Sequence, residues 1–470
     1  MVRRQPTRTP EPARAPAKTP EAAGHRKRRA REHRLRTATA TTSAALTLVL
    51  TACAAGHDGP VARTAPAHLS GTIQLWHHYS DREAAVIQSV VDGFEKKYPD
   101  VHVEVHSGQQ DTKITQVVAS GGDVDALITN VNATLGTACK TMENLAPFMR
   151  RDGVRASDFQ GIFAAATAFG GRRCSLPTTS DVYGLYYNTK LLARAGVTRP
   201  PRTLRELERA ALKLTTYKPD GSIRTLGFDP LVGFQQNTSA TFGGTAGVTW
   251  MKGGQSAIAS SPQWRALLGW QHDFVEKIGY AKLKAFSAGL GDEWSANNAF
   301  QTGRIAMALD GEWRVAFIQD QAPHLAYGTA PFPVLDGSGQ AYGGGFVSAA
   351  DIGVSKRSGN KEAAWALVKY MTTDTDAAVR LANGIKNIPT LKSAADSPRL
   401  DAPKQYRTFL DAAAHPASRT SPVTEIGSML TATMDDFWTG YQQRPQEGLD
   451  SGLKKVDTDI DNALSLRRAK

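Results

Sequence analysis

The stretch TIQLWHHYSDRE, residues 72–83, crowds ring and polar side chains into the junction between an apolar segment and an amphipathic one. Trp76, His77, Tyr79 and Asp81 are of types that could catalyse a reaction, bind a metal or hold a ligand. In open α/β sheets, ligands bind beyond the carboxyl ends of strands, where the following helices offer free N–H groups. Aromatic faces beside hydrogen-bonding groups match the two kinds of surface on a pyranose ring. This turn therefore predicts sugar binding, with core packing of Trp76 and helix capping by Asp81 as the alternative.

Signatures of catalysis and metal binding are weak elsewhere. The sequence contains no G-x-S-x-G, H-E-x-x-H, P-loop or G-x-G-x-x-G motif. His77 and His78 are adjacent, so in an extended segment their side chains point apart and cannot share a metal ion. No metal ion or other cofactor is predicted. Asp310 and Glu312 are two residues apart and could form a carboxylate pair, so an exported polysaccharide hydrolase stays open as an alternative.

Residues 1–52 have the composition of a basic arm followed by an export signal. Residues 1–36 carry nine of the twelve excess positive charges of the chain, and an uncharged apolar segment follows at 37–52. This segment is shorter than the roughly 20 residues that a membrane-spanning helix needs, which predicts a secretory signal peptide. The rest of the chain is nearly balanced in charge, and this argues against nucleic-acid binding.

The sequence LTAC at residues 50–53 resembles a bacterial lipobox, in which cleavage leaves a cysteine that carries lipid. We therefore expect lipidation of Cys53 and anchoring at the extracellular face of the cell membrane. Residues 53–69 are the lipidated cysteine and a flexible tether rich in Ala, Pro and Gly. Outside the cytoplasm the two remaining cysteines, Cys139 and Cys174, predict a disulfide, with two buried free thiols as the alternative.

Hydrophobic periodicity predicts the α/β class. A strand begins at residue 73, apolar residues at helical spacing predict a helix over 83–98, and VHVEV at 101–105 alternates as a strand. A strand, helix and strand within about 35 residues form a βαβ unit with a parallel pair. A further strand at 182–188 and a helix at 361–371 indicate that the pattern continues through a second lobe.

Several longer segments recur in the order and spacing of one family. They lie within about 70–465 and read IQLWHHYSDREAAVIQSVVDGFEKKYPDVHVEV, GGDVDALITN, DVYGLYYNTKLLARAG, FQTGRIAMALDGEWRVAFI, YGTAPFPVLDG, GGGFVSAADIGVSKRSGNKEAAWALVKYM and NGIKNIPTLKSA. Together they resemble the family 1, sugar-type extracellular solute-binding proteins that serve bacterial ATP-binding-cassette (ABC) importers. The resemblance implies a two-lobed fold of the type II periplasmic-binding-protein class, each lobe a mostly parallel sheet flanked by helices. One lobe would combine 70–179 with 310–348, and the other would combine 184–304 with 353–465.

The same resemblance implies a set of ligand contacts in the cleft between the lobes. Carboxylate and amide groups would hydrogen-bond sugar hydroxyls, and Trp294 or Trp313 would stack on a ring. Asn130 replaces an acidic residue that is usual in the family, which leaves the hydroxyl pattern open. The expected contacts are Trp76, His77, Tyr79, Asp81, Asn130, Asp181, Tyr183, Phe242, Gly243, Trp294, Asp310, Glu312, Trp313, Gly344, Gly345 and Phe346.

These observations predict a lipid-anchored, monomeric receptor for a carbohydrate, of di- or oligosaccharide size, that catalyses no reaction. By the resemblance, its partners would be ABC permease subunits and their ATPase. A binding-fold sensor or adhesin without a transporter stays open as an alternative. Polyamine, ferric iron or a small anion stays open as the ligand.

Overall fold

The computed structural model describes residues 61–443 and 448–469. The predicted signal peptide and Cys53 lie outside these residues and stay predictions. The strands are β1 Gly71–His77, β2 Val101–His106, β3 Ala126–Asn130, β4 Ala168–Phe169, β5 Arg172–Arg173, β6 Ser175–Asn188, β7 Thr216–Tyr217, β8 Ile223–Thr225, β9 Met251–Lys252, β10 Gln255–Ser256, β11 Met307–Gly311, β12 Tyr327–Pro331, β13 Val347–Val354 and β14 Ile388–Pro389.

Helices are interleaved with these strands, as expected for the α/β class. The α-helices are α1 Asp81–Lys97, α2 Asp111–Ser120, α3 Val131–Ala138, α4 Ala146–Asp152, α5 Gly161–Ala166, α6 Thr189–Arg194, α7 Leu204–Leu214, α8 Ser239–Ala246, α9 Pro262–Ile278, α10 Tyr280–Ala288, α11 Arg314–Gln321, α12 Lys361–Thr373, α13 Thr375–Ile385, α14 Lys392–Ala395, α15 Lys404–Ala414, α16 Met429–Tyr441 and α17 Leu449–Arg468. Two short 3-10 helices are η1 Cys139–Thr141 and η2 Ala156–Asp158. None of the described helices is long and apolar enough to cross a membrane.

The first βαβ unit forms as the sequence predicts. β1 and β2 pair in parallel, with Ile73 opposite Val103, and α1 crosses between them. Val101 and Val103 of β2 are buried and Val105 is half-buried, while His102 and Glu104 are exposed, which is the alternation that a strand with one covered face requires. In the described residues the main sheet has the order β11-β6-β13-β3-β1-β2, with β12 and β14 also on β6. β13 is antiparallel to both β3 and β6, so the sheet is mixed rather than mostly parallel.

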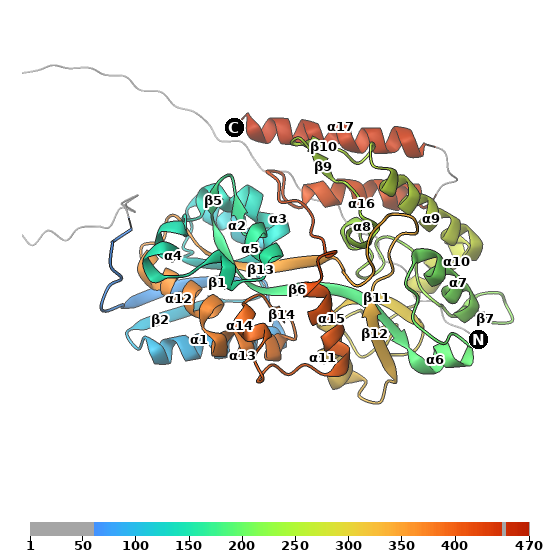
Figure 1. Cartoon of the computed structure of the whole chain (residues 1–470), viewed down its shortest axis with the longest axis horizontal. Helices are drawn as coiled ribbons and strands as arrows, with labels where there is room; N and C mark the ends of the chain where they lie inside the picture. Colours follow the sequence, from blue (N-terminus) through green and yellow to red (C-terminus); the bar gives the residue numbers. More distant parts are fainter. Residues whose placement is uncertain (1–60, 444–447, 470) are drawn as a thin grey trace, which may run out of the picture. The chain divides into compact units, whose positions relative to one another are not determined.

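The long strand β6 joins the two parts of the molecule (Figure 1). Its first half, up to Val182, pairs with β13, whereas its second half, from Tyr183, pairs with β11 and β12 on its two sides. Both halves are antiparallel ladders. One strand therefore supplies backbone hydrogen bonds to both lobes, and the change of partner falls between Val182 and Tyr183.

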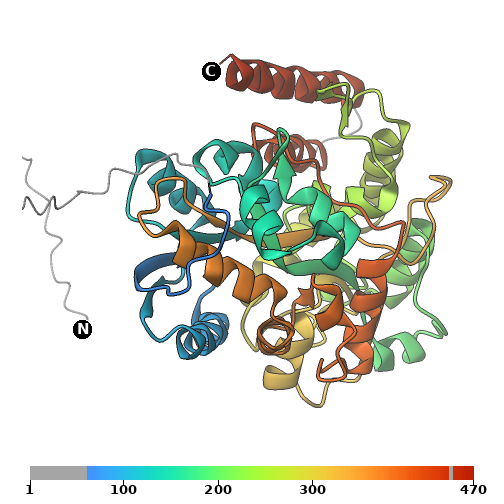
Figure 2. The ribbon, with the colours of Figure 1, turned by 60° about the vertical axis from the view of Figure 1, so that its left-hand side comes forward.

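Each lobe has a hydrophobic core of its own. The first core contains residues of β1, α1, α12 and α13, including Ile73, Phe94, Leu367 and Ile385. The second core contains residues of α7, α8, α9, α16 and α17, including Leu207, Phe242, Trp264, Trp438 and Ile460. A middle cluster, which includes Leu135, Cys139, Val182, Tyr186 and Phe409, lies around β6. Both ribbon views show α1 beside α12 and α13 and away from α17 (Figures 1 and 2).

This packing corrects the predicted division of the later segments between the lobes. Residues 310–348 were expected in the first lobe, but Phe332 and Leu335 belong to the second core. Residues 353–465 were expected in the second lobe, but α12 and α13 pack in the first core. The physical reason is that β11 pairs with the second half of β6 and does not cross between the lobes. β13 pairs with β3 and with the first half of β6, so it lies in the first lobe and returns the chain there.

The predicted disulfide is present between Cys139 and Cys174. It links η1 to the residue before β6, and both cysteines are buried in the middle cluster. The bond closes a loop with a sequence separation of 35 residues. Such a loop restricts the unfolded chain, so the bond stabilises the position of α3 and η1 beside the strand that joins the lobes.

We expect Cys139→Ala or Cys174→Ala to lower the free energy of unfolding by about 3–4 kcal/mol, because either change removes the same loop constraint. The double variant should lose little more than either single variant. Denaturant titration of the three variants tests this, with Cys53→Ala as the control that leaves the bond intact. Additive losses from the two single variants would contradict it.

Candidate functional site

The turn after β1 brings Trp76 against a neighbouring strand rather than into free space. Its ring lies 5.0 Å from the ring of His106 on β2, measured between centroids. The Lys113 ammonium lies 5.7 Å from the same ring, a cation–π contact. The indole N–H is buried without a hydrogen-bond partner among the described residues. Asp81 begins α1 with a φ of +47° and its side chain is exposed, while Ser80 makes no side-chain cap to the helix.

The two histidines of this turn have opposite electrostatic settings. Burial, and next the charge of His78, lowers the pKa of His77 to about 4, so its ring is neutral at pH 7. Burial also acts against a charge on His78, but Asp111, 3.2 Å away, outweighs it and raises the pKa of His78. The Tyr79 hydroxyl lies 3.3 Å from the Thr179 hydroxyl on β6. This turn therefore contacts the strand that joins the lobes.

Asp181 and Tyr183 lie on β6 on either side of its change of partner. Asp181 accepts a hydrogen bond from the side-chain amide of Asn387. Burial raises the pKa of Asp181 to about 7, because the nearby His78 and the Asn387 hydrogen bond favour the charged form too weakly to offset it. The Tyr183 ring meets Trp313 edge-on at 5.3 Å and lies 5.5 Å from Phe346. The hinge thus carries a titratable carboxyl beside a cluster of rings.

The carboxyls of the DGEW turn are held inside the protein. Asp310 pairs with the fully buried Arg314 at 2.6 Å and accepts the N–H of Gly311. Glu312 is also fully buried, and one of its oxygens accepts the N–H of Val182 at 2.7 Å. Burial, and then the charge of Asp181, raises the pKa of Glu312 well above its usual range. Its other oxygen has no partner in the described structure.

Two tryptophans continue the row of rings from the hinge to the surface. Trp313 is 8% exposed and its indole N–H has no partner within the described residues. Trp294 lies 6.4 Å from Trp313, measured between ring centroids, and is 48% exposed. The row therefore runs from Phe346 through Tyr183 and Trp313 to Trp294. Apolar ring faces exposed in this way can contact the C–H face of a ligand.

A cavity of about 170 Å³ lies beside the buried end of this row. It brings together three of the predicted contacts, Asn130, Tyr183 and Phe346. The side-chain amide of Asn130 donates to the Ser348 hydroxyl, which lines the same cavity, at 2.9 Å. The opposite wall comes from α8 and from the segment that leads into α16, namely Ala240, Ser421, Pro422, Gly427, Ser428, Leu430 and Thr431. We refer to this space as the hinge cavity.

The wall residues of the second lobe were missed by the sequence analysis. Ser421 is almost fully buried, and its hydroxyl has no hydrogen-bond partner in the part of the chain that is described. A buried hydroxyl without a partner is costly and is expected where a ligand supplies the missing bond. The sequence feature that could have indicated these wall residues is a run of Ser, Thr, Pro and Gly at 418–428, directly before an amphipathic helix.

Phe242 and Gly243 do not lie at the hinge cavity, which corrects the prediction for them. The Phe242 ring is fully buried in the second core, with the rings of Trp438 and Phe332 each 5.8 Å away. Gly243 packs beside Trp264 in the same core. The chain turns Ala240, rather than this pair, toward the cavity. α8 is buried on nearly all sides, and Ala240 is its one residue that is only half-buried.

Gly344 and Gly345 serve close packing of the backbone next to Phe346. A Cβ atom on Gly345 would lie 2.6 Å from the carbonyl oxygen of Tyr183, so no larger residue fits without a shift. The Gly345 N–H donates to the Ser418 hydroxyl at 3.0 Å. Gly344 approaches the backbone of 417–418 equally closely. These glycines therefore position Phe346 at the hinge cavity.

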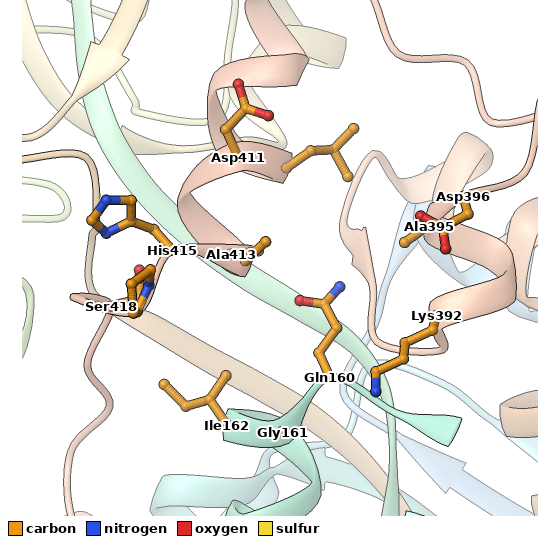
Figure 3. Close-up of a pocket in the computed structure, with 13 residues that line it drawn as sticks. Gln160, Gly161, Ile162, Lys392, Ala395, Asp396, Asp411, Ala413, His415 and Ser418 are labelled. Atoms are coloured by element: carbon orange, nitrogen blue, oxygen red, sulfur yellow. The ribbon is translucent and has the colours of Figure 1, made fainter. Parts of the chain in front are cut away.

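A larger cavity of about 660 Å³ lies elsewhere, between α5, α14 and α15 (Figure 3). Gln160 and Lys392 line it from one side, and His415 and Ser418 line it from another. None of its lining residues is a Phe, Tyr or Trp, and none is a predicted ligand contact. Two of the rings and the Ser421 hydroxyl, which has no partner among the described residues, line the hinge cavity instead, so the hinge cavity is the better candidate site. No group of three or more His, Cys, Asp or Glu in the described residues could hold a metal ion.

Comparison with known proteins identifies the family. Residues 79–378 match the model of the bacterial extracellular solute-binding proteins. The chain belongs to this family. The maltotriose-binding protein of Pyrococcus abyssi is 21% identical over 337 residues, which cover 70% of this chain and 69% of that protein.

Solved structures show the same fold. CpMnBP1 with mannotriose bound has a TM-score of 0.72 at 23% identity, and the match covers 83% of this chain and 99% of that one. The sugar-binding protein MalE of Xanthomonas citri has a TM-score of 0.68 at 21% identity, and the match covers 85% and 98%. At these identities the likeness establishes the two-lobed solute-binding fold.

The raised pKa of Asp181 predicts how stability depends on pH. The folded protein holds this proton up to about pH 7, whereas an unfolded Asp loses it near pH 4. The stabilisation is therefore fully present below about pH 4 and is lost as the pH rises through about 7. Asp181→Asn should flatten the fall in melting temperature between pH 5 and 8, with Asp92→Asn on the exposed face of α1 as the control. Equal pH profiles for all three proteins would contradict this.

Proposed function

We propose that this solute-binding protein captures a carbohydrate of di- or oligosaccharide size at the hinge cavity. The observation that carries the proposal is the pairing of unpartnered buried polar groups with a row of rings. Among the described residues the Ser421 hydroxyl and the Trp313 N–H have no hydrogen-bond partner. Ser421 lines the hinge cavity with the rings of Tyr183 and Phe346, and the Trp313 ring contacts that of Tyr183. Sugar hydroxyls would supply the missing hydrogen bonds while ring faces cover the C–H surfaces.

The relatives support this class of ligand. One is named for maltotriose binding, and CpMnBP1 has been solved with mannotriose and with mannobiose. The site of this chain has the same general requirements, because a linear sugar needs both flat apolar faces and directed hydrogen bonds. Asn130, whose amide donates to Ser348, lines the hinge cavity beside the rings of Tyr183 and Phe346.

The positions of the Asp310 and Glu312 carboxyls favour a receptor function over a hydrolase function. A glycosidase needs two carboxyl groups about 5–10 Å apart that face the substrate. Asp310 is engaged by Arg314 and Glu312 by the N–H of Val182, both in the interior. These bonds stabilise the turn after β11, so we assign the two carboxyls a structural role and propose that the protein catalyses no reaction.

The receptor would work as one part of an importer. We propose that cleavage of the signal peptide leaves Cys53 as a lipid-bearing N-terminal residue. Residues 53–69 would then tether the monomeric protein to the outer face of the membrane. The loaded form would deliver its sugar to ABC permease subunits coupled to an ATPase. Closure of the lobes over the sugar would be the recognition signal, since contacts from both lobes favour the closed state.

Thermal unfolding of the full chain tests the proposed ligand class. The probes are maltose, maltotriose, mannobiose and mannotriose, with spermidine, ferric citrate and phosphate as controls. A sugar present at a hundred times its dissociation constant should add about 2.7 kcal/mol of stability and raise the melting temperature by a few degrees. The sugar should be recovered intact. A shift with a control alone would reject the carbohydrate, and shortened sugar products would reject the receptor.

Trp294→Ala should weaken binding of the sugar found in this way about tenfold, which corresponds to about 1.4 kcal/mol. The side chain is 48% exposed, so the melting temperature of the free protein should change little. Tyr217→Ala is the matched control, since Tyr217 is 44% exposed and lies on β7, away from the hinge cavity. Calorimetric titration measures both variants. Equal affinity of Trp294→Ala and the wild type would remove Trp294 from the site.

A further inference from the structure

The two lobes touch at a second place besides the hinge strands. Gly136 on α3 meets the backbone of Thr424 so closely that a Cβ atom would lie 1.8 Å from the Thr424 carbonyl oxygen. Only a residue without a side chain permits this approach. The backbone carbonyl carbon of Thr424 would also be too close, at 2.5 Å. A backbone carbonyl cannot turn away as a flexible side chain can.

The segments that meet at Gly136 belong to different lobes. α3 directly follows β3 of the first lobe, and its residue Leu135 lies in the middle cluster. On the other side, Ile426 and Leu430 anchor the segment 420–430 in the second core. A change in the angle between the lobes must therefore open or close this contact.

Neighbouring residues extend the contact. Val423 packs against the middle cluster, which contains Leu135 and Cys139. Lys140 on η1 lies close enough to Glu425 that its charge, after the hydrogen bond from Arg468, helps to lower the pKa of that carboxyl. We name the contact of α3 and η1 with residues 423–425 the end wall.

The end wall stands beside the hinge cavity. Asn130, which lines the cavity, immediately precedes α3, while Ser421 and Gly427 line it on either side of Thr424 in sequence. From the cavity the row of rings leads through Tyr183 and Trp313 to Trp294, which is half-exposed. The hinge cavity is thus bordered both by residues next to the end wall and by the row of rings, whose last member is exposed.

We propose that the end wall makes the cleft a dead-end site, so that a linear oligosaccharide is bound by one terminal sugar in the hinge cavity with the rest of its chain directed toward Trp313 and Trp294. This proposal rests on the proposed function. It adds that the protein recognises one end of the oligosaccharide and leaves the other end free. Gly136 is then the specificity-determining residue, because it allows the end wall to form.

Gly136→Ala tests the wall. Alanine favours helix by about 1 kcal/mol over glycine, so α3 itself should not be weakened, and any loss must come from the contact with Thr424. Gly269→Ala in α9 is the matched control, because a Cβ atom there meets nothing within 4 Å. We expect Gly136→Ala to weaken sugar binding at least tenfold at an unchanged melting temperature, and Gly269→Ala to change neither.

Amide hydrogen exchange tests the wall without any ligand. In free Gly136→Ala, residues 420–427 should exchange faster than in the wild type, whereas Gly269→Ala should match the wild type. If Gly136→Ala fails to fold, Val423→Ala loosens the same contact without adding an atom and should give the same faster exchange. Unchanged exchange together with unchanged affinity would overturn the end wall.

End-modified sugars test which end is read. Maltotriose or mannotriose, whichever binds the wild type, is compared with a form carrying 2-aminobenzamide at the reducing end and a form blocked at the non-reducing end. One form should lose at least a hundredfold in affinity and the other should bind normally. Equal tolerance or equal loss of both would overturn the dead-end site. If none of the four sugar probes binds, the proposed function fails and end reading fails with it. If only a disaccharide binds, the proposed function stands and the dead-end site is overturned. The exchange measurement decides the wall in either case.

Discussion

The structure depends on the change of partner within β6. A strand can hydrogen-bond to only two neighbours at a time, and β6 gives its first half to β13 and its second half to β11 and β12. At the change of partner a backbone donor is left for a side chain to satisfy. Glu312 fills this place by accepting the N–H of Val182. The lobes are thus joined by main-chain hydrogen bonds that can bend, while the residues beside the junction are held in place.

The same junction explains the electrostatics of the site. Burial raises the pKa of both Asp181 and Glu312, and the charge of Asp181 raises the pKa of Glu312 further. Arg314, a fully buried cation near this junction, is paired with Asp310. A neutral, hydrogen-bonding surface results near the hinge cavity. Such a surface suits an uncharged polyol, because sugar hydroxyls can donate to and accept from groups that carry no net charge.

Local patterns predicted much of the fold, but not its long-range pairing. The alternation of Val101, Val103 and Val105 and the helical spacing before it were enough to predict the first βαβ unit, because each rule acts over a few residues. The predicted assignment of the later segments to the two lobes is wrong because the sequence indicates that Phe332 and Leu367 are buried, but not in which lobe's core they pack. The same limit applies to Phe242, because the sequence does not indicate that its ring packs in the second core. Ser421 was missed because an orphaned hydroxyl becomes evident only when its neighbours are placed.

The site combines two lobes that contribute unlike chemistry, and this bears on how binding can move them. The first lobe and hinge supply Asn130, Ser348 and the rings, whereas the second lobe supplies the hydroxyls of 421–431. Under the proposed function a sugar would contact both sets, because the rings and Asn130 lie on one wall of the hinge cavity and the hydroxyls lie on the other. A ligand therefore gains its full set of contacts only when both lobes reach it, and differential contact of this kind is what shifts a population toward closure.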